Sequence, residues 1–244
     1  MTPSPTFQRR RRTALHLGAL LFAAAAALSA WSQNVDVTAR IEVTHHEAKK
    51  ASSAADVVVW LTPLDKSIPL PVRKTQEYTL AQKDKQFTPH MLVVPTGSSI
   101  NFPNLDPFFH NVFSMFNGQR FDLGLYEAHT RKTVRFDREG VSYIFCNIHP
   151  QMGAVVVALS TPFYAISARD GSVALHDIPP GHYQLNVWAE NMPIDDLTRL
   201  GHPVDISAQN TQLGTIPLHT TGDIMGHHTN KFGEAYPKPT AGPY

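Results

Sequence analysis

The chain has 244 residues, of which 42% are hydrophobic, so it is long enough to bury the core of one or two domains. Its 21 lysines and arginines nearly balance 20 aspartates and glutamates. This balance gives no indication of nucleic-acid binding, and no nucleic-acid partner is expected.

The first 32 residues have the pattern of a secretory signal peptide. Four arginines at positions 9–12 precede an apolar run over residues 15–28, and Ala30-Trp31-Ser32 is a candidate cleavage site. The run is short for a membrane span, so membrane contact is expected only through an uncleaved anchor. The arginines also fit twin-arginine export, which leaves the choice between that route and the Sec route open. Cleavage leaves 17 cations against 20 acidic side chains, and we expect the mature chain in the periplasm.

Two strands are expected before the middle of the chain. Residues 35–43 alternate between apolar and polar side chains, which is typical of a half-buried strand. Residues 57–62 begin with an unbroken apolar run over residues 57–61, which indicates a strand buried on both faces. Prolines at positions 63, 69 and 71 then predict a linker.

The middle of the chain is also rich in strand patterns. Residues 95–98 are expected to form the turn of a hairpin, in which residues 100–102 run back beside residues 91–94. Residues 121–126 are interpreted as an irregular connection containing a helical turn. The strands predicted here cover residues 75–80, 91–94, 100–102, 133–136, 141–145 and 153–159.

One short loop contains three side chains of types that can bind soft metal ions, and a fourth lies upstream of it. Cys146, His149 and Met152 stand at the start, middle and end of the link between two predicted strands, and His110 lies upstream. One thiolate, two imidazoles and a weak thioether form the ligand set of a blue copper electron-transfer site. We therefore expect these four residues to bind one type 1 copper ion.

Cys146 is the single cysteine of the chain. An exported protein in an oxidising compartment usually pairs its thiols, so an unpaired one indicates an intermolecular disulfide or a special chemical role. Metal ligation also accounts for His149 and Met152.

Two stretches carry a pattern shared with known proteins: Gly140-x-x-Tyr143-x-x-Cys146-x-x-His149-x-x-Met152 and, upstream, His110-Asn111. The pattern resembles that of cupredoxins, the blue copper proteins of the plastocyanin and amicyanin type, and the short ligand loop is most similar to that of amicyanin. Residues 87–90, 102–114 and 146–150 resemble a group of periplasmic plastocyanin-like proteins named methylamine-utilisation proteins. The resemblance covers residues 87–160 and implies a cupredoxin Greek-key β-sandwich over residues 75–160.

The resemblance also implies roles for neighbours of the ligands. Asn111 would tie the two ligand segments together by hydrogen bonds. The ring edge of His149 would reach the surface within an apolar patch made by Phe108, Phe109 and Pro150, where the electron leaves and a redox partner docks. His90 begins the first arm of the predicted hairpin, at the end that carries His110, and is a candidate either to hydrogen-bond a metal ligand or to lie beside the metal.

The character of the chain changes after residue 160. Asp170-Gly171 is a strong hairpin signal, and residues 163–188 resemble a carboxypeptidase regulatory-like module, a small immunoglobulin-like β-sandwich. The two strands that normally precede this hairpin are missing directly upstream. We expect the early strands to supply them, so that residues 34–63 and 161–218 form one split sandwich around the inserted cupredoxin. A serial order with a longer cupredoxin is the alternative.

The tail over residues 219–244 has no apolar period and is expected to be mobile. Its histidines, His219, His227 and His228, are candidates for a transient metal ion, but a disordered tail is the favoured interpretation.

The expected fold is therefore all-β, and three classes of function follow from it. The first is an electron carrier between a redox-protein donor and acceptor. The second is copper binding for delivery, sensing or structure. The third, an enzyme, is disfavoured because copper enzymes with this resemblance usually have a histidine beside the cysteine, whereas Phe145 and Asn147 flank Cys146.

Overall fold

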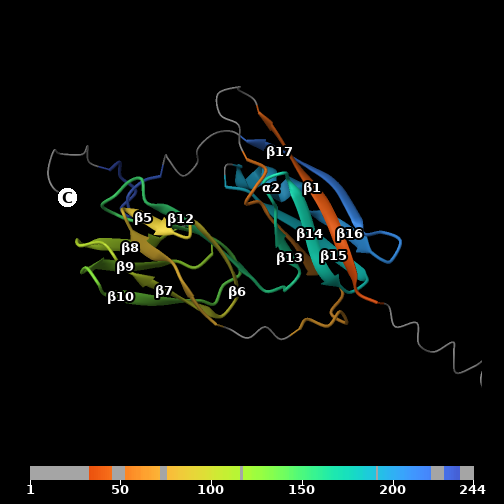
Figure 1. Ribbon diagram of the computed structural model, residues 1–244, viewed down its shortest axis with the longest axis horizontal. Helices are drawn as coiled ribbons and strands as arrows, with labels where there is room; N and C mark the ends of the chain where they lie inside the picture. Colours follow the sequence, from red (N-terminus) through yellow and green to blue (C-terminus); the bar gives the residue numbers. More distant parts are fainter. Residues whose placement is uncertain are drawn as a thin grey trace, which may run out of the picture. The chain divides into compact units, whose positions relative to one another are not determined.

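The computed structural model describes residues 33–45, 53–71, 76–115, 118–190, 192–220 and 228–236. The predicted signal peptide and His227 lie outside these ranges. Within them the chain forms seventeen strands and one short helix, which confirms the prediction of an all-β protein (Figure 1). No helix in the described part of the chain is long and apolar enough to cross a membrane.

Two sheets enclose the core that carries the predicted metal ligands. The larger has the strand order β6-β12-β11-β8-β9 and the smaller β10-β7-β3, while β4 and β5 form a separate ribbon. Phe102, Phe136 and Ile144 are fully buried in this core. The strands are β3 (Glu77–Thr79), β4 (Ala81–Lys83), β5 (Gln86–Thr88), β6 (Met91–Pro95), β7 (Ser98–Pro103), β8 (His110–Ser114), β9 (Phe121–Tyr126), β10 (Arg131–Phe136), β11 (Gly140–Phe145) and β12 (Gly153–Leu159).

The pairing of three strands brings the predicted ligands to one end of the larger sheet. β11 and β12 form an antiparallel hairpin whose last pair is Phe145 with Gly153, so residues 146–152 are its loop. β8 pairs with β11 at Phe113 and Phe145. Because these strands are antiparallel, the chain that leaves β11 continues toward the start of β8, where His110 lies.

β12 contributes side chains to two different cores. Its residues Ala154 and Val156 belong to the core described above, whereas Val155 and Val157 belong to a second core. Successive side chains of a strand point to opposite faces, so a strand covered on both sides can serve two cores. This explains why the run is apolar at every position.

The second core is enclosed by sheets of order β14-β1-β17 and β13-β2-β15-β16. β1 is antiparallel to β14 and parallel to β17, and β2 is antiparallel to β13 and β15. Strands that precede the metal-site strands in the sequence therefore pair with strands that follow them. The domain boundaries stay a prediction. The elements are β1 (Val35–His45), β2 (Val58–Pro63), β13 (Tyr164–Ile166), β14 (Ser172–Ile178), β15 (Gly181–Trp188), α2 (Ile194–Leu200), β16 (His202–Ile206) and β17 (Gln212–Thr220).

Three local expectations are wrong. The turn at residues 95–98 does not close a hairpin, because β6 pairs with β12 while β7 pairs with β10 and β3. Residues 121–126 are not an irregular connection but β9, which is antiparallel to β8. The turn at Asp170-Gly171 joins β13 and β14, which lie in different sheets.

Candidate metal centre

The loop over residues 146–152 folds back on itself. The backbone N–H of Cys146 donates to the carbonyl oxygen of Met152 (3.3 Å), and the N–H of Met152 donates to that of His149 (3.0 Å). Pro150 restricts the residue before it to extended conformations. These constraints fix the path of the backbone on both sides of His149.

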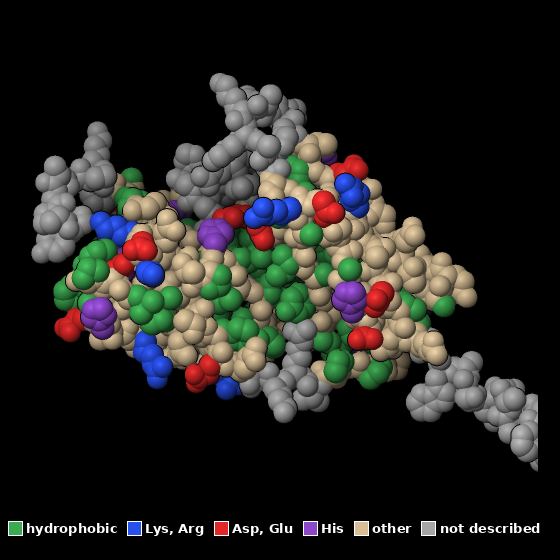
Figure 2. Space-filling model, in the orientation of Figure 1, with side chains coloured by type: hydrophobic (Ala, Val, Ile, Leu, Met, Phe, Trp, Pro, Cys, Tyr) green, Lys and Arg blue, Asp and Glu red, His purple; other side chains and the backbone are tan. Residues whose placement is uncertain are grey.

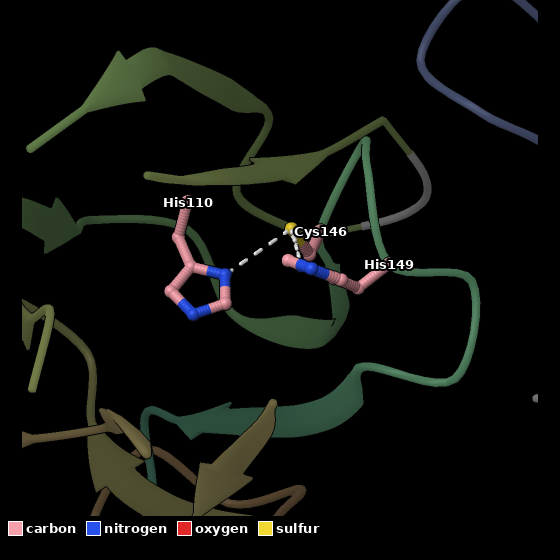
Figure 3. A group of neighbouring side chains, drawn as sticks. All are labelled: His110, Cys146 and His149. Atoms are coloured by element: carbon pink, nitrogen blue, oxygen red, sulfur yellow. Dashed lines mark hydrogen bonds between the residues drawn. The ribbon is translucent and has the colours of Figure 1, made fainter. Parts of the chain in front are cut away.

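Three potential ligand atoms converge beside this loop. Cys146 Sγ lies 3.7 Å from His110 Nδ1 and 3.6 Å from His149 Nδ1, and all three atoms lie within 4.8 Å of one another. Figure 3 shows both rings directing a nitrogen at the sulfur. Cys146 and His110 are fully buried, and His149 is 7% exposed. In the described ranges this is the one group of three or more metal-binding side chains of the His, Cys, Asp and Glu types.

Asp106 holds the His110 ring in place from the other side. Its Oδ2 accepts a hydrogen bond from His110 Nε2 (2.7 Å) and from the N–H of Lys85 (3.0 Å), while Oδ1 accepts from the N–H of Asp84 (2.6 Å). Burial alone would raise the pKa of Asp106, but these hydrogen bonds lower it below its usual value. The carboxylate therefore keeps the proton of His110 on Nε2 and leaves Nδ1 with a free lone pair toward Cys146.

Burial sets the protonation of the three groups. It lowers the pKa of His110 despite the opposing effect of Asp106. Burial, together with the charges of His110 and Lys85, lowers the pKa of His149 to about 4. Burial raises the pKa of the Cys146 thiol, although nearby backbone N–H groups act in the opposite direction. Both imidazoles are thus neutral at pH 7, as metal ligation requires.

This donor set fits a copper ion. Two neutral imidazole nitrogens and one sulfur face a common point, which is the His₂Cys set of a trigonal copper site. Met152 is fully buried in the same core cluster as Cys146 and is the candidate for the weak fourth ligand. A carboxylate bound to the far nitrogen of a ligating histidine, as Asp106 is to His110, is the usual arrangement around protein metal sites.

Asn111 links the two ligand segments. Its Oδ1 accepts a hydrogen bond from the backbone N–H of Asn147 (3.3 Å), and its Nδ2 donates to Asp122 Oδ1 (2.8 Å). Because Asn111 follows His110 and Asn147 follows Cys146, the bond couples the positions of two predicted ligands.

His90 does not join the three converging side chains. Its Nδ1 is 3.1 Å from the carbonyl oxygen of Gly153, which directly follows the ligand loop, and its Nε2 is 2.8 Å from Glu190 Oε1. The side chain is 54% exposed, and the hydrogen bond to Glu190 raises the pKa of His90. The structure therefore places His90 between Gly153, at the start of β12, and Glu190, which lies two residues after the end of β15.

Two of the predicted docking residues lie next to His149: Pro150 follows it in the chain, and Phe108 packs near its ring. The Phe108 ring is 5.2 Å from that of His110 and 5.7 Å from that of His149, measured between centroids. Phe109 is 52% exposed, and Pro150 is also exposed. Ile148 in the loop is exposed as well, by 44%, and was not predicted. The Lys85 ammonium lies over the Phe108 ring at 5.2 Å and adds a positive charge at this surface.

Of the tail histidines, the structure describes His219 and His228, and these two have different partners. His219 belongs to β17, where its Nδ1 is 2.6 Å from Thr44 Oγ1, whereas His228 stacks on Phe145 at a centroid distance of 3.9 Å. Residues 228–236 lie against the ligand loop, where Lys231 contacts Asn147 and Tyr236 contacts Cys146, while the expected mobility of the tail stays a prediction. Sequence reasoning missed Asp106, Lys231 and Tyr236 as neighbours of the site. Asp106 stands four residues before His110, which is a usable signal, but the other two carry none.

No family model matches the chain, and no curated protein matches it. Among solved structures, a purple cupredoxin from Nitrosopumilus maritimus is 23% identical with a TM-score of 0.31, and the match covers 34% of this chain and 99% of that one. An oxidised amicyanin variant is 16% identical with a TM-score of 0.32, over 34% of this chain and 81% of that one.

A copper-containing nitrite reductase from Thermus scotoductus SA-01 is 22% identical with a TM-score of 0.33, over 40% of this chain. The matched region spans only 27% of the reductase. All three matches are below 25% identity and a TM-score of 0.5, so none of them assigns the chain to a family.

Proposed function

We propose that this protein is an exported type 1 copper protein that carries single electrons between two redox proteins in the periplasm. The observation that carries the proposal is the convergence of His110 Nδ1, His149 Nδ1 and Cys146 Sγ in a buried site, with His110 held by Asp106. When bound, a copper ion supplies one-electron chemistry by changing between Cu(I) and Cu(II). We assign Met152 as its weak axial ligand.

The surroundings of the donors favour a carrier over a delivery protein. Cys146 and His110 are completely buried, and hydrogen bonds fix the loop and the His110 ring. A metal that must be handed to another protein needs an accessible site, whereas an electron carrier needs ligands that stay in place when the metal changes valence. The buried and hydrogen-bonded donors fit the second requirement.

We propose no catalytic site. Phe145 and Asn147 flank Cys146, so the histidine that would lead electrons to a second copper is not at either neighbouring position. The 7% exposure of His149 instead leaves one ligand at the surface for electron exchange.

The partner would dock over His149. Phe108, Phe109 and Pro150, with Ile148, provide an apolar surface, and redox encounters typically use small interfaces of this kind. On the face drawn in Figure 2, acidic and basic side chains are interspersed among hydrophobic ones.

Electron self-exchange tests the proposal, because it needs no known partner. In mixtures of the reduced and oxidised copper-loaded protein, NMR line broadening should report fast exchange. Phe109→Asp should slow this exchange and leave the visible spectrum unchanged, whereas Ile194→Asp on α2, at 60% exposure a matched control, should change neither. Slow exchange in the unmodified protein, with ready copper loss to a chelator, would support delivery instead.

A further inference from the structure

The stretch over residues 228–236 has a defined conformation of its own, although nothing in its sequence predicts one (Figure 1, the dark blue stretch near the C-terminal label). The side chain of Asn230 accepts hydrogen bonds from the N–H groups of Phe232 (2.9 Å) and Glu234 (3.0 Å). Its backbone N–H donates to the Glu234 carbonyl (2.9 Å) and its carbonyl accepts from the Gly233 N–H (3.0 Å). Gly233 has a φ of +79°, which glycine adopts without strain.

This folded stretch contacts the backbone of the predicted thiolate ligand. The Tyr236 hydroxyl donates a hydrogen bond to the carbonyl oxygen of Cys146 (2.9 Å). The His228 ring stacks on Phe145 with planes 12° apart, and its Nε2 lies 3.1 Å from the same hydroxyl. Two side chains of the stretch therefore pack on the residues at and before the ligand.

Lys231 completes a closed circuit of hydrogen bonds. Its backbone N–H donates to Asn147 Oδ1 (2.9 Å), and its ammonium contacts Asp122 Oδ2 (2.7 Å). Asp122 Oδ1 accepts from Asn111 Nδ2 (2.8 Å), and Asn111 Oδ1 accepts from the N–H of Asn147 (3.3 Å). Four residues are thus joined in a ring, and two of them directly follow His110 and Cys146 in the chain. The Lys231 and Asp122 side chains are 24% and 34% exposed, so solvent weakens this ion pair only in part.

We propose that residues 228–236 are a working part of the metal centre, and that Lys231 and Tyr236 are positioning residues for Cys146 and His110. The ring sets the spacing between the two segments that carry these donors. Tyr236 fixes the peptide of Cys146 and closes the site against solvent on that side. The identity of the metal rests on the proposed function, but the contacts and their effect on Cys146 do not.

The first test therefore uses the metal-free protein. Cys146 is the single cysteine of the chain and is fully buried, so its reaction with a disulfide reagent such as Ellman's reports directly on access to the site. A chain that ends at residue 227 should react about tenfold faster or more, the change expected when several hydrogen bonds to the loop are lost. A chain that ends at residue 236 keeps the stretch and is the matched control, expected to react like the full chain. The pH profile of the rate separates access from a change in thiol pKa.

Point variants keep the test valid if the shortened chain folds poorly. Lys231→Met removes the contact with Asp122 and should raise thiol reactivity, whereas Lys231→Arg should restore protection. Tyr236→Phe keeps the aromatic side chain and removes only its hydroxyl group. Lys66→Met changes an exposed lysine elsewhere and should have no effect. Far-UV circular dichroism must be unchanged in each variant that is compared.

The second test loads the same proteins with Cu(II) and Co(II). Competition with a chelator should reveal an affinity about 10- to 100-fold lower in Lys231→Met and Tyr236→Phe than in the full chain, as for other residues that orient metal ligands. The ligand-field bands of Co(II) should shift, which a purely structural role would not cause. Equal thiol protection in the full chain and the chain ending at residue 227 would overturn the proposal, whatever metal is bound. Increased thiol reactivity with unchanged affinity and bands would overturn the positioning role. A protein that binds neither metal but loses thiol protection would contradict the proposed function alone.

Discussion

Asp106 determines which nitrogen of His110 faces the thiol. The carboxylate accepts hydrogen bonds through both oxygens, one from the imidazole and two from the backbone of the β4–β5 turn. The ring is thereby held in one orientation and one tautomer before any metal binds.

Replacing Asp106 with asparagine should weaken copper binding by about 10- to 100-fold. An asparagine can still accept from His110 through its oxygen, but its amide would then meet the N–H of Asp84 as a second donor. Competition with a chelator measures the change in affinity. Asp137→Asn, which alters an exposed carboxylate paired with Arg135, serves as the control and should bind copper normally. Equal affinities for the two variants would mean that Asp106 does not orient the ligand.

The burial of His149 predicts a pH dependence in the metal-free protein. The pKa of a histidine is ordinarily 6.5, and that of His149 in the folded protein is about 4. Between these two pH values, His149 is therefore protonated only in the unfolded chain. Stability should therefore fall as the pH decreases from 6.5 to 4, by up to about 3 kcal/mol. Urea unfolding of the metal-free protein at several pH values measures this loss. The loss of stability should be smaller in His149→Gln and, in His202→Gln, equal to that of the unmodified protein. If stability fell equally with pH in all three proteins, the low pKa would not belong to His149.

At the level of residues, the sequence identifies the three side chains whose donor atoms converge, His110, Cys146 and His149, but not the residues that hold them in place. Cys146, His149 and Met152 lie close together in the chain, and their spacing shows that one loop can direct them to one point. Asn147 and Lys231 are 84 positions apart, and no periodic or compositional signal marks their contact. Contacts of this kind can be identified only from the three-dimensional structure.

At the level of elements, strands are easier to predict than their pairing. Turn residues at 95–98 and at Asp170-Gly171 mark sharp changes of direction, and both turns exist. Yet a tight turn can join strands of one sheet or of two, and local sequence does not distinguish these cases. β9 was missed because Gly124, with a φ of +65°, interrupts its pattern near an irregularity in the pairing with β8.

Gly171 is required by the turn between β13 and β14. Its φ is +80°, and a Cβ added there would lie 2.4 Å from the carbonyl oxygen of Ile41. Gly171→Ala should therefore destabilise the fold by several kcal/mol, because steric overlap adds to the strain of about 1–3 kcal/mol. Gly214→Ala is the matched control, since its φ is +74° and nothing lies within 4 Å of the added atom. Urea denaturation should show the larger loss for Gly171→Ala, and similar losses would mean that β1 moves aside easily.

At the level of the whole molecule, the two cores meet in β12. Val155 and Val157 are fully buried in the second core, and Val141 and Tyr143 of β11 pack against it. The apolar run of this strand predicts burial on both faces, but it cannot show that the second face is covered by strands from both ends of the chain.

A protein cut to residues 75–160 should consequently expose an apolar sheet face. Uncovering each buried valine costs about 1.5–3 kcal/mol, and exposed patches of this kind promote association. We expect this segment to bind a hydrophobic dye strongly and to elute as oligomers from a sizing column, unlike the chain from residue 34 onward. A monomeric segment that binds no dye would show that the metal-site sandwich is independent of the second core.

We propose above that His110, Cys146, His149 and Met152 form a type 1 copper site. The most direct measurement is the visible and EPR spectrum of the purified protein loaded with one equivalent of Cu(II), with Cys146→Ser as the control. We expect an intense thiolate-to-copper band and a narrow copper hyperfine splitting, both lost in Cys146→Ser. Weak bands with a wide hyperfine splitting, unchanged by Cys146→Ser, would show that these residues do not form a type 1 site.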